Sequence, residues 1–291
     1  MRFGAHLPIA GFGRNAPPSA STLIECAEAA EALGYTTLCA NDHLVFSVPW
    51  TDGLVALSAA AARTSSIALM TTASLVVVRG AASLASAASA IADVSGGRLT
   101  VCLTAGSTPS DYEAVGIPFD ERWSRFDREI KAFRSYIARA EVAVPVWIAS
   151  WGAETGLRRV ARLGDGWLAS AYHATADHFV TARAYLNKQL TDAGKDPARF
   201  PNAVATTYTY VTENPGEAEA VLRTLISPRQ APSDLRDRML IGPGAECIEK
   251  LRRLEEAGVD QVFVWPVADE VRQLEQFAND VAPHFAAGSV A

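Results

Sequence analysis

Short apolar runs rich in β-branched residues recur along the chain, and longer amphipathic or Ala-rich stretches separate them. Such runs are typical of buried strands, and the stretches between them have the spacing of helices. Strands are predicted near 2–7, 36–40, 67–77, 99–104, 144–149, 166–170, 203–211 and 260–265. Helices are predicted near 20–33, 53–63, 80–94, 121–139, 153–163, 174–193, 215–227, 243–257 and 268–286. Nearly every strand is therefore followed by a helix.

This alternation indicates an α/β fold with parallel strands and right-handed crossovers. Eight strands in 291 residues favour closure into a (β/α)8 TIM barrel. An open, doubly wound sheet is the alternative. Barrels of about 250 residues commonly form one domain. We therefore expect residues 1–291 to form a single barrel domain.

Capping signals support several of these boundaries. Ser19 or Ser21 can cap the first helix and Gly34 can end it, while Gly164 and Gly258 can end later helices. The longest irregular stretches are 41–52, 105–120 and 227–242. Long loops of a barrel commonly form its substrate pocket or a lid. The third stretch is expected to be an insertion or a lid element.

Composition limits the expected ligands and location. No uninterrupted apolar run reaches the length of a membrane span, about 18 residues. A strand begins at Arg2, which leaves no room for a secretory signal, so a soluble, cytoplasmic protein is expected. The formal charge is −6 and no Lys/Arg cluster is present. Nucleic acid and anionic membranes are therefore not expected as partners, and small molecules are.

The cysteines do not indicate a metal site. Cys26, Cys39, Cys102 and Cys247 are widely separated and form no CxxC or Cys/His cluster. We expect buried free thiols and no metal. Cys39, four residues before His43, is the one candidate for a reactive thiol.

Polar residues follow the second predicted strand directly, as Asn41, Asp42 and His43. In a barrel these side chains would lie at the mouth. Histidine suits proton transfer near neutral pH, and a neighbouring carboxylate can fix its tautomer. His43 is therefore the predicted catalytic residue, with Asp42 beside it. Alternatively, Asp42 caps a turn and His43 satisfies a buried backbone group.

Small and hydroxyl-bearing residues mark other strand exits. They occur at Thr71–Ser74, at Thr104–Ser107, at Ala149–Gly152 and around Ser170. Such residues allow a ligand to approach the backbone closely. The segment after residue 149 leads into a helix, whose N-terminal N–H groups can bind phosphate. Alternatively, Ser150 only caps that helix.

Several motifs together resemble the luciferase-like monooxygenase family, in the branch of the deazaflavin (coenzyme F420)-dependent oxidoreductases. The resemblance covers almost the whole chain. The matching motifs are Phe3–Pro8, Leu33–Tyr35, Asn41–His43, Ser95–Leu99, Gly116–Arg122, Pro145–Ile148, Gly164–Trp167 and Glu256–Asp260.

The resemblance implies a bacterial-luciferase-like barrel that holds a flavin or deazaflavin ring in its mouth. His43 then lies near the reactive C5 edge of the ring, and the Ala73–Ser74 bond matches a non-proline cis peptide of the family. The phosphate lies near the loop after the fifth strand. The implied cofactor-binding residues are His6, Asn41, Ala73, Ser74, Gly106, Ser107, Ala149, Ser150, Trp151, Gly152 and Ser170.

Two departures from the family pattern bear on the substrate. Ser107 stands where some deazaflavin-dependent sugar-phosphate dehydrogenases of the family have a catalytic glutamate. None of the chain's four lysines lies at a predicted strand exit, so an uncharged or apolar substrate is expected. Aromatic residues near the exits could line its pocket or pack under the loops. They are Phe46, Trp50, Trp151, Tyr172 and Trp265.

The resulting functional hypothesis is hydride transfer between F420 and a small organic substrate, with His43 handling the proton. The close alternative is a two-component monooxygenase that uses O2 and FMN reduced by a separate reductase. A non-catalytic flavin-binding barrel is the alternative of another class. A lyase or aldolase would need a lysine or metal cluster at the strand ends. By resemblance, a homodimer is expected.

Overall fold

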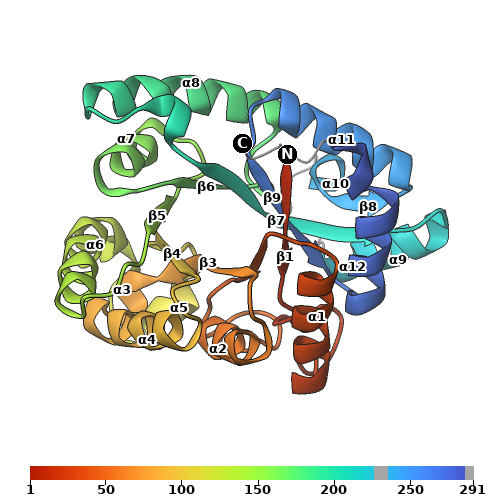
Figure 1. Cartoon of the computed structure of the whole chain (residues 1–291), viewed down its shortest axis with the longest axis horizontal. Helices are drawn as coiled ribbons and strands as arrows, with labels where there is room; N and C mark the ends of the chain where they lie inside the picture. The colour runs from red at the N-terminus through yellow and green to blue at the C-terminus, as the bar shows by residue number, and fades with distance from the viewer. Residues whose placement is uncertain (226–234, 286–291) are drawn as a thin grey trace.

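The strands close into a barrel, as predicted (Figure 1). The computed structural model describes residues 1–225 and 235–285. The named strands pair in parallel in the order β6-β5-β4-β3-β2-β1-β9-β7, and β6 also pairs with β7. The ring consists of β1 (Arg2–His6), β2 (Thr37–Ala40), β3 (Ala68–Leu75), β4 (Leu99–Thr104), β5 (Val146–Ala149), β6 (Trp167–Ser170), β7 (Asn202–Val211) and β9 (Gln261–Pro266).

One strand was not predicted. β8 (Leu240–Gly242) pairs with the end of β7 at Thr209–Val211 and lies outside the ring. It falls within the stretch 227–242, which the sequence predicts as irregular, and α10 (Leu235–Arg238) precedes it. Residues 227–234 of the expected insertion or lid lie outside the described residues.

Helices surround the strands (Figure 1). In the described part of the chain, no helix combines the length and apolar character that crossing a membrane requires. In addition to α10, the described helices are α1 (Ala20–Ala32), α2 (Gly53–Arg63), α3 (Val76–Arg79), α4 (Ala81–Val94), α5 (Pro109–Glu113), α6 (Arg122–Arg139), α7 (Glu154–Leu163), α8 (Ala176–Asp192), α9 (Pro215–Leu225), α11 (Gly244–Glu256) and α12 (Glu270–Asp280). Turns of 3-10 helix occur at Phe119–Glu121, Pro197–Arg199 and Ala282–His284.

Two predicted boundaries are corrected. The strand predicted at 67–77 ends at Leu75, which pairs with Thr104 of β4 and donates its N–H to the Asp42 side chain. The following residues form α3. The helix predicted at 268–286 ends at Asp280, and a 3-10 turn follows.

The predicted caps of the first helix are confirmed. The Ser19 hydroxyl accepts the Thr22 N–H at 3.1 Å, and Gly34 follows the helix with φ +80°. Gly adopts this left-handed conformation without a Cβ clash. Asp52 caps α2 by accepting two backbone N–H groups. Local sequence therefore sets where these helices begin and end.

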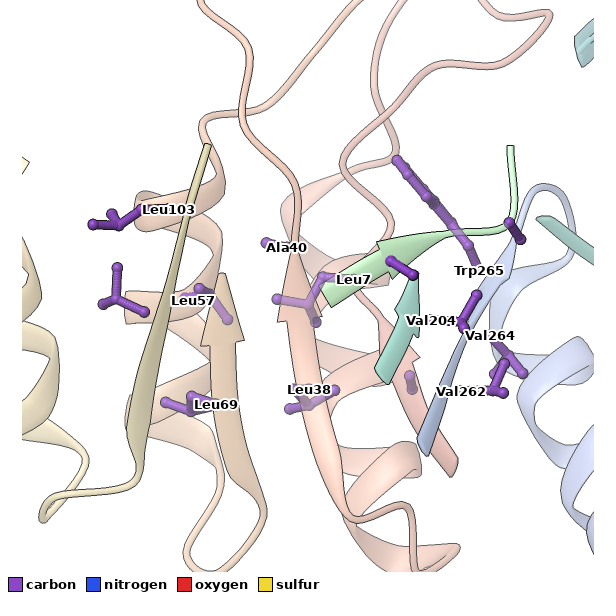
Figure 2. Packing of buried hydrophobic residues seen from close by; sticks show 14 of the residues in the cluster. Leu7, Leu38, Ala40, Leu57, Leu69, Leu103, Val204, Val262, Val264 and Trp265 are labelled. Atoms are coloured by element: carbon purple, nitrogen blue, oxygen red, sulfur yellow. The ribbon is translucent and has the colours of Figure 1, made fainter. Parts of the chain in front are cut away.

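The apolar core has two layers. The larger lies between strands and helices, where Figure 2 shows Leu38 of β2 and Leu57 of α2. The smaller cluster includes Trp147 and Phe263. A Cβ on Gly166 would come within 2.3 Å of the Trp147 ring, and one on Gly4 within 2.5 Å of Phe263. Aromatic rings are therefore packed directly against the backbone at these two glycines, and a ligand site is expected at an end of the barrel.

Candidate active site

The predicted site residues converge on the carboxyl ends of the strands. All ring strands are parallel, so their exits lie on one rim of the barrel. The residues after β2, β3, β4, β5 and β6 contribute to that rim. It is where enzymes of this architecture carry their active sites.

His43 lies beside a buried carboxylate from another loop. Nδ1 of His43 is 2.7 Å from Oδ2 of Asp111, and Asp111 is 1% exposed. Oδ1 of Asp111 accepts the N–H groups of Leu44 and Val45 at 2.7 and 2.9 Å. An ionised carboxylate only accepts hydrogen bonds, so Nδ1 of His43 carries the hydrogen. Nε2 is thereby left to take or give a proton.

The carboxylate beside His43 is therefore Asp111, whereas the sequence suggested Asp42. Asp42 is buried and pairs with Arg79, at 2.6 Å from Oδ1 and 2.7 Å from Oδ2. Its Oδ2 also accepts the Leu75 N–H at 2.9 Å. Arg79 bridges to Asp52 at 2.6 Å. Asp42 thus fixes the end of β3, a positioning task rather than proton transfer.

Asn41 and His6 form the adjoining part of this network. Oδ1 of Asn41 accepts the N–H groups of Asp42 and Ala73, at 2.9 and 3.1 Å. The Asn41 N–H donates to Nε2 of His6, whose Nδ1 donates to the Leu7 carbonyl at 2.7 Å. Burial lowers the pKa of His6 to about 3, so the ring is neutral. His6 has no ring nitrogen left for a cofactor.

The end of β3 is irregular. The register with β4 shifts between Thr71 and Ser74, which is a bulge. The cis peptide bond lies at Thr72–Ala73, one bond before the predicted Ala73–Ser74 position. Ser74 is fully buried, and its hydroxyl has no hydrogen-bond partner among the described residues. A buried hydroxyl without a partner is costly, so a ligand atom that bonds to it would be stabilised.

The loop after β4 reaches both His43 and β3. Gly106 has φ +78°, and a Cβ there would lie 2.6 Å from the Leu75 side chain. The loop continues through exposed Ser107 into α5, which carries Asp111. The Tyr112 hydroxyl donates to the Ala105 carbonyl and ties this helix to the strand end. The loop and α5 thus place the Asp111 carboxylate beside His43.

The loop after β5 is held through its carbonyl groups: Nε1 of Trp167 donates to the Ser150 carbonyl at 3.0 Å, and Nε2 of His178 lies 2.8 Å from the Trp151 carbonyl. The Ser150 hydroxyl accepts the Gly152 N–H at 3.3 Å, and Gly152 has φ +101°. Ser150 does not cap α7, because the N-cap position is Ala153 and makes no side-chain cap bond. The Trp151 side chain is 48% exposed. Ser150 is only 9% exposed, and Ser170 at the end of β6 is partly buried.

Aromatic rings gather around His43. Phe46 stacks on His43 with 4.1 Å between ring centroids, and Trp50 meets His43 edge-on at 4.9 Å. Trp50 also contacts Trp265, whose ring stacks on His6 at 3.5 Å. Figure 2 shows Trp265 projecting from the end of β9. Phe46 and Trp50 thus lie beside the acid/base candidate, while Trp265 is packed beneath them.

A second aromatic group follows β6. Tyr172 contacts His173 edge-on, and His173 stacks on Trp151 at 3.6 Å. Burial, together with the charge of Arg238, lowers the pKa of His173 to about 4. Arg238 donates to the Tyr172 carbonyl at 2.9 Å. His173 is therefore neutral near pH 7.

The cysteines are buried free thiols, as predicted. Burial raises the pKa of Cys26 and Cys247 to about 12, and it also raises the pKa of Cys39 and Cys102. A thiol is nucleophilic only as the thiolate, so Cys39 is not a nucleophile here.

Surface hollows occur elsewhere but bring no such chemistry together. One of about 410 Å³ lies between α7 and α8 and is lined by Arg158, Arg159 and Arg162. Another, of about 250 Å³, includes Asp165, which precedes β6 and so lies at the amino end of the strands. Neither contains a residue of the rim described above. The rim around His43 is the better candidate for the active site, because it brings together side chains that can transfer a proton.

A closed parallel barrel with an oriented histidine at its carboxyl rim is typical of enzymes with the (β/α)8 fold. The sequence model of the luciferase-like monooxygenases matches residues 1–142 and 128–233. The chain therefore belongs to the luciferase-like monooxygenase family, and it is an oxidoreductase of that family. A search among curated proteins finds no significant match.

Solved structures share the fold at low sequence identity. The monooxygenase RslO1 from Streptomyces bottropensis is 20% identical, with 98% of this chain and 100% of that chain covered and a TM-score of 0.81. An F420-dependent secondary alcohol dehydrogenase, solved with an F420-acetone adduct, is 16% identical over 97% and 98%, with a TM-score of 0.81. The oxygenating constituent of the 3,6-diketocamphane monooxygenase of Pseudomonas putida, solved with FMN, is 17% identical over 98% and 99%, with a TM-score of 0.73.

Proposed function

We propose that this chain is a coenzyme F420-dependent oxidoreductase that transfers a hydride between the deazaflavin and a small, uncharged organic substrate. The observation that carries the proposal is the His43–Asp111 pair at the barrel rim, 2.7 Å apart, next to the bulged end of β3. An oriented histidine with a free Nε2 suits a reaction in which a proton accompanies each hydride.

The rim residues fit a flavin-like cofactor. The unpartnered hydroxyl of Ser74 and the backbone around Gly106 would meet its ring. Ser150, Gly152 and Ser170 would hold its phosphate, because hydroxyls and backbone N–H groups near a helix N-terminus bind anions. Each of these assignments agrees with the chemistry of the side chain at that position.

When bound, F420 supplies a carbon, C5, that gives or takes a hydride and with it two electrons. Reduction of a carbonyl substrate adds this hydride at carbon and one proton at oxygen. His43 would deliver the proton from Nε2, and Asp111 would stabilise the ring in that orientation. In the opposite direction the same nitrogen accepts the proton of an alcohol.

Two alternatives remain. An FMN-dependent monooxygenase would use the same rim, and solved structures with each cofactor share this fold. A non-catalytic flavin-binding barrel would have no use for an acid/base histidine whose second nitrogen has no hydrogen-bond partner among residues 1–225 and 235–285. The buried Asp111 carboxylate, which serves His43 and its loop, favours catalysis over storage.

The test is a parallel titration of the purified protein with oxidised F420 and with FMN, followed by fluorescence. Tighter binding of F420 is the expected result. A preference for FMN would instead indicate the monooxygenase, and binding of neither would contradict both assignments. In the His43→Ala variant, cofactor affinity should stay within about threefold, while turnover falls by about 10²–10⁴. If the variant and the unmodified protein turned over at the same rate, His43 would have no role in the reaction.

A further inference from the structure

Two side chains from later elements bind the carbonyl groups of the loop after β5. Nε1 of Trp167, on β6, donates to the Ser150 carbonyl at 3.0 Å. Nε2 of His178, in the first turn of α8, lies 2.8 Å from the Trp151 carbonyl. A carbonyl oxygen only accepts hydrogen bonds, so Nε2 of His178 carries the hydrogen. Both carbonyl groups are therefore turned toward β6 and α8.

The N–H groups of the same loop are left to other partners. A trans peptide carries its C=O and N–H on opposite sides, so the bond to His178 turns the Gly152 N–H away from α8. That N–H lies 3.3 Å from the Ser150 hydroxyl, which is long for a hydrogen bond. The N–H groups of Trp151 and Ala153 make no hydrogen bond in the described part of the chain. A loop with bound carbonyl groups and available N–H groups favours an anion.

The His178 ring packs directly on Gly152. A Cβ at Gly152 would lie 2.3 Å from Nε2 of His178 and 3.2 Å from the Ala182 side chain. His178 is exposed, whereas the next residue, Phe179, is buried and stacks on Trp167 at 4.6 Å. The contacts of His178 are therefore with the loop, and the adjacent Phe179 supplies the contact with the core.

One carboxylate lies near these N–H groups, because Glu154 is in the first turn of α7. Its side chain is 68% exposed and pairs with Arg158 at 3.4 Å. Water and Arg158 screen this charge, so it opposes an anion in the loop less than a buried carboxylate would.

From these observations we propose that His178 positions the loop after β5 for the phosphate of the cofactor. Its bond to the Trp151 carbonyl holds the peptide between Trp151 and Gly152 in the orientation that presents N–H groups to the phosphate. His178 acts through the loop, so it is a positioning residue and takes no part in proton transfer at His43. This inference rests on the phosphate site of the proposed function, and it applies to F420 and to FMN because both carry a phosphate.

The test compares cofactors with and without the phosphate, by fluorescence titration of binding. The probes are F420 and its phosphate-free deazaflavin core, and FMN and riboflavin, which differ only in the phosphate. His178→Leu removes the hydrogen bond to the Trp151 carbonyl. F420 and FMN should then bind about three- to tenfold more weakly, as expected from the loss of one hydrogen bond. Riboflavin and the deazaflavin core should bind as they do to the unmodified protein.

Two further variants separate the hydrogen bond from the presence of a histidine. The amide of glutamine can donate to the Trp151 carbonyl, so His178→Gln should keep the affinity for F420 and FMN within about twofold. His284→Leu removes an exposed histidine from the 3-10 turn after α12 and should change no affinity.

The outcomes distinguish this inference from the cofactor assignment. Equal losses for probes with and without the phosphate would overturn the inference, because a general disturbance of the rim weakens both. Unchanged binding of all probes to His178→Leu would also overturn it. If FMN binds more tightly than F420 and shows the expected loss, the F420 assignment fails while the inference stands. If no probe binds to the unmodified protein, the proposed function fails and the inference fails with it.

Discussion

The two sides of the barrel rim are built differently. On the side of β2, β3 and β4, the side chains of Asn41, Asp42 and Asp111 accept backbone N–H groups from neighbouring segments. On the side of β5 and β6, the Ser150 hydroxyl accepts one N–H at 3.3 Å and Trp151 is half exposed. We call these the tied side and the open side.

This difference suits the two tasks proposed for the rim, proton transfer and phosphate binding. Groups that move protons must be held in place before the substrate arrives. Groups that hold a phosphate gain their hydrogen bonds only from the ligand. We therefore expect substitutions on the tied side to affect turnover and stability, and substitutions on the open side to affect affinity. The predictions below run from the largest expected effect to the smallest.

The largest effect is expected from Asp111→Asn. The neutral amide no longer stabilises a positively charged His43 ring, and its NH2 group competes for the orientation that the carboxylate oxygens hold. Turnover should fall by about 10²–10⁴, while cofactor affinity stays within about threefold. The measurement combines steady-state kinetics with the cofactor titration. Asp120→Asn, an exposed residue further along the same loop, is the control. Turnover of Asp111→Asn equal to this control would exclude Asp111 from catalysis.

The second prediction concerns stability on the tied side. Arg79→Met leaves the buried Asp42 carboxylate without its counter-ion, and Arg79 itself is only 14% exposed. The free energy of unfolding should fall by about 3 kcal/mol, as expected when one partner of a buried pair is removed. Urea unfolding measures this change.

The control for that change is Arg63→Met. Arg63 pairs with Glu28, but its side chain is 57% exposed. Exposed pairs contribute less than about 1 kcal/mol. A similar loss in both variants would mean that the Asp42–Arg79 pair does not tie the end of β3 more firmly than an ordinary surface pair.

The third prediction concerns acid stability. The pKa of His6 is about 3 in the folded protein and 6.5 as its ordinary value. Between these pH values the unfolded chain binds a proton that the folded protein does not. The contribution of His6 to the free energy of unfolding is therefore fully present above about pH 6.5. Between pH 6.5 and pH 3 it falls by about 1.4 kcal/mol for each pH unit of acidification. His6→Gln should reduce the slope between pH 6 and pH 4 by about that amount in urea unfolding.

His173, on the open side, gives the matched comparison. Its pKa is also lowered, by burial and by Arg238, but its surroundings are less enclosed. The slope change in His173→Gln should therefore be smaller than in His6→Gln, because solvent screens the charge. Equal slope changes in the two variants would show that solvent screens the histidine charge equally on the tied side and on the open side.

The sequence predicted the barrel and most helices because hydrophobic spacing is a local signal. It placed His43 correctly at the end of β2 but suggested its neighbour Asp42 as the carboxylate. Side chains of consecutive residues in extended backbone point to opposite sides, so adjacent residues seldom face each other. The actual partner, Asp111, is 68 positions away and reaches His43 only because β4 lies two strands from β2 in the ring.

Other differences have similar causes. β8 was missed because a strand of three residues, Leu240–Gly242, is too short to show alternation. Arg79 was missed because its partner Asp42 lies 37 residues earlier, across the bulge of β3. One usable signal was present: the predicted loop 105–120 contains Asp111 between a strand exit and a helix, where a functional carboxylate is common.

The smallest effect is expected on the open side, from Gly156→Ala in α7. A Cβ at Gly156 would lie 2.3 Å from the Ser150 hydroxyl, so that side chain must turn away. Because Ala favours helix over Gly by about 1 kcal/mol, stability should not fall. If Ser150 binds the cofactor phosphate, affinity should drop about three- to tenfold. Ser150→Ala should show the same loss, and Gly156→Ala should add nothing to it, since the hydroxyl is already gone. Independent, additive losses would mean that Gly156 acts on the open side by another route than Ser150.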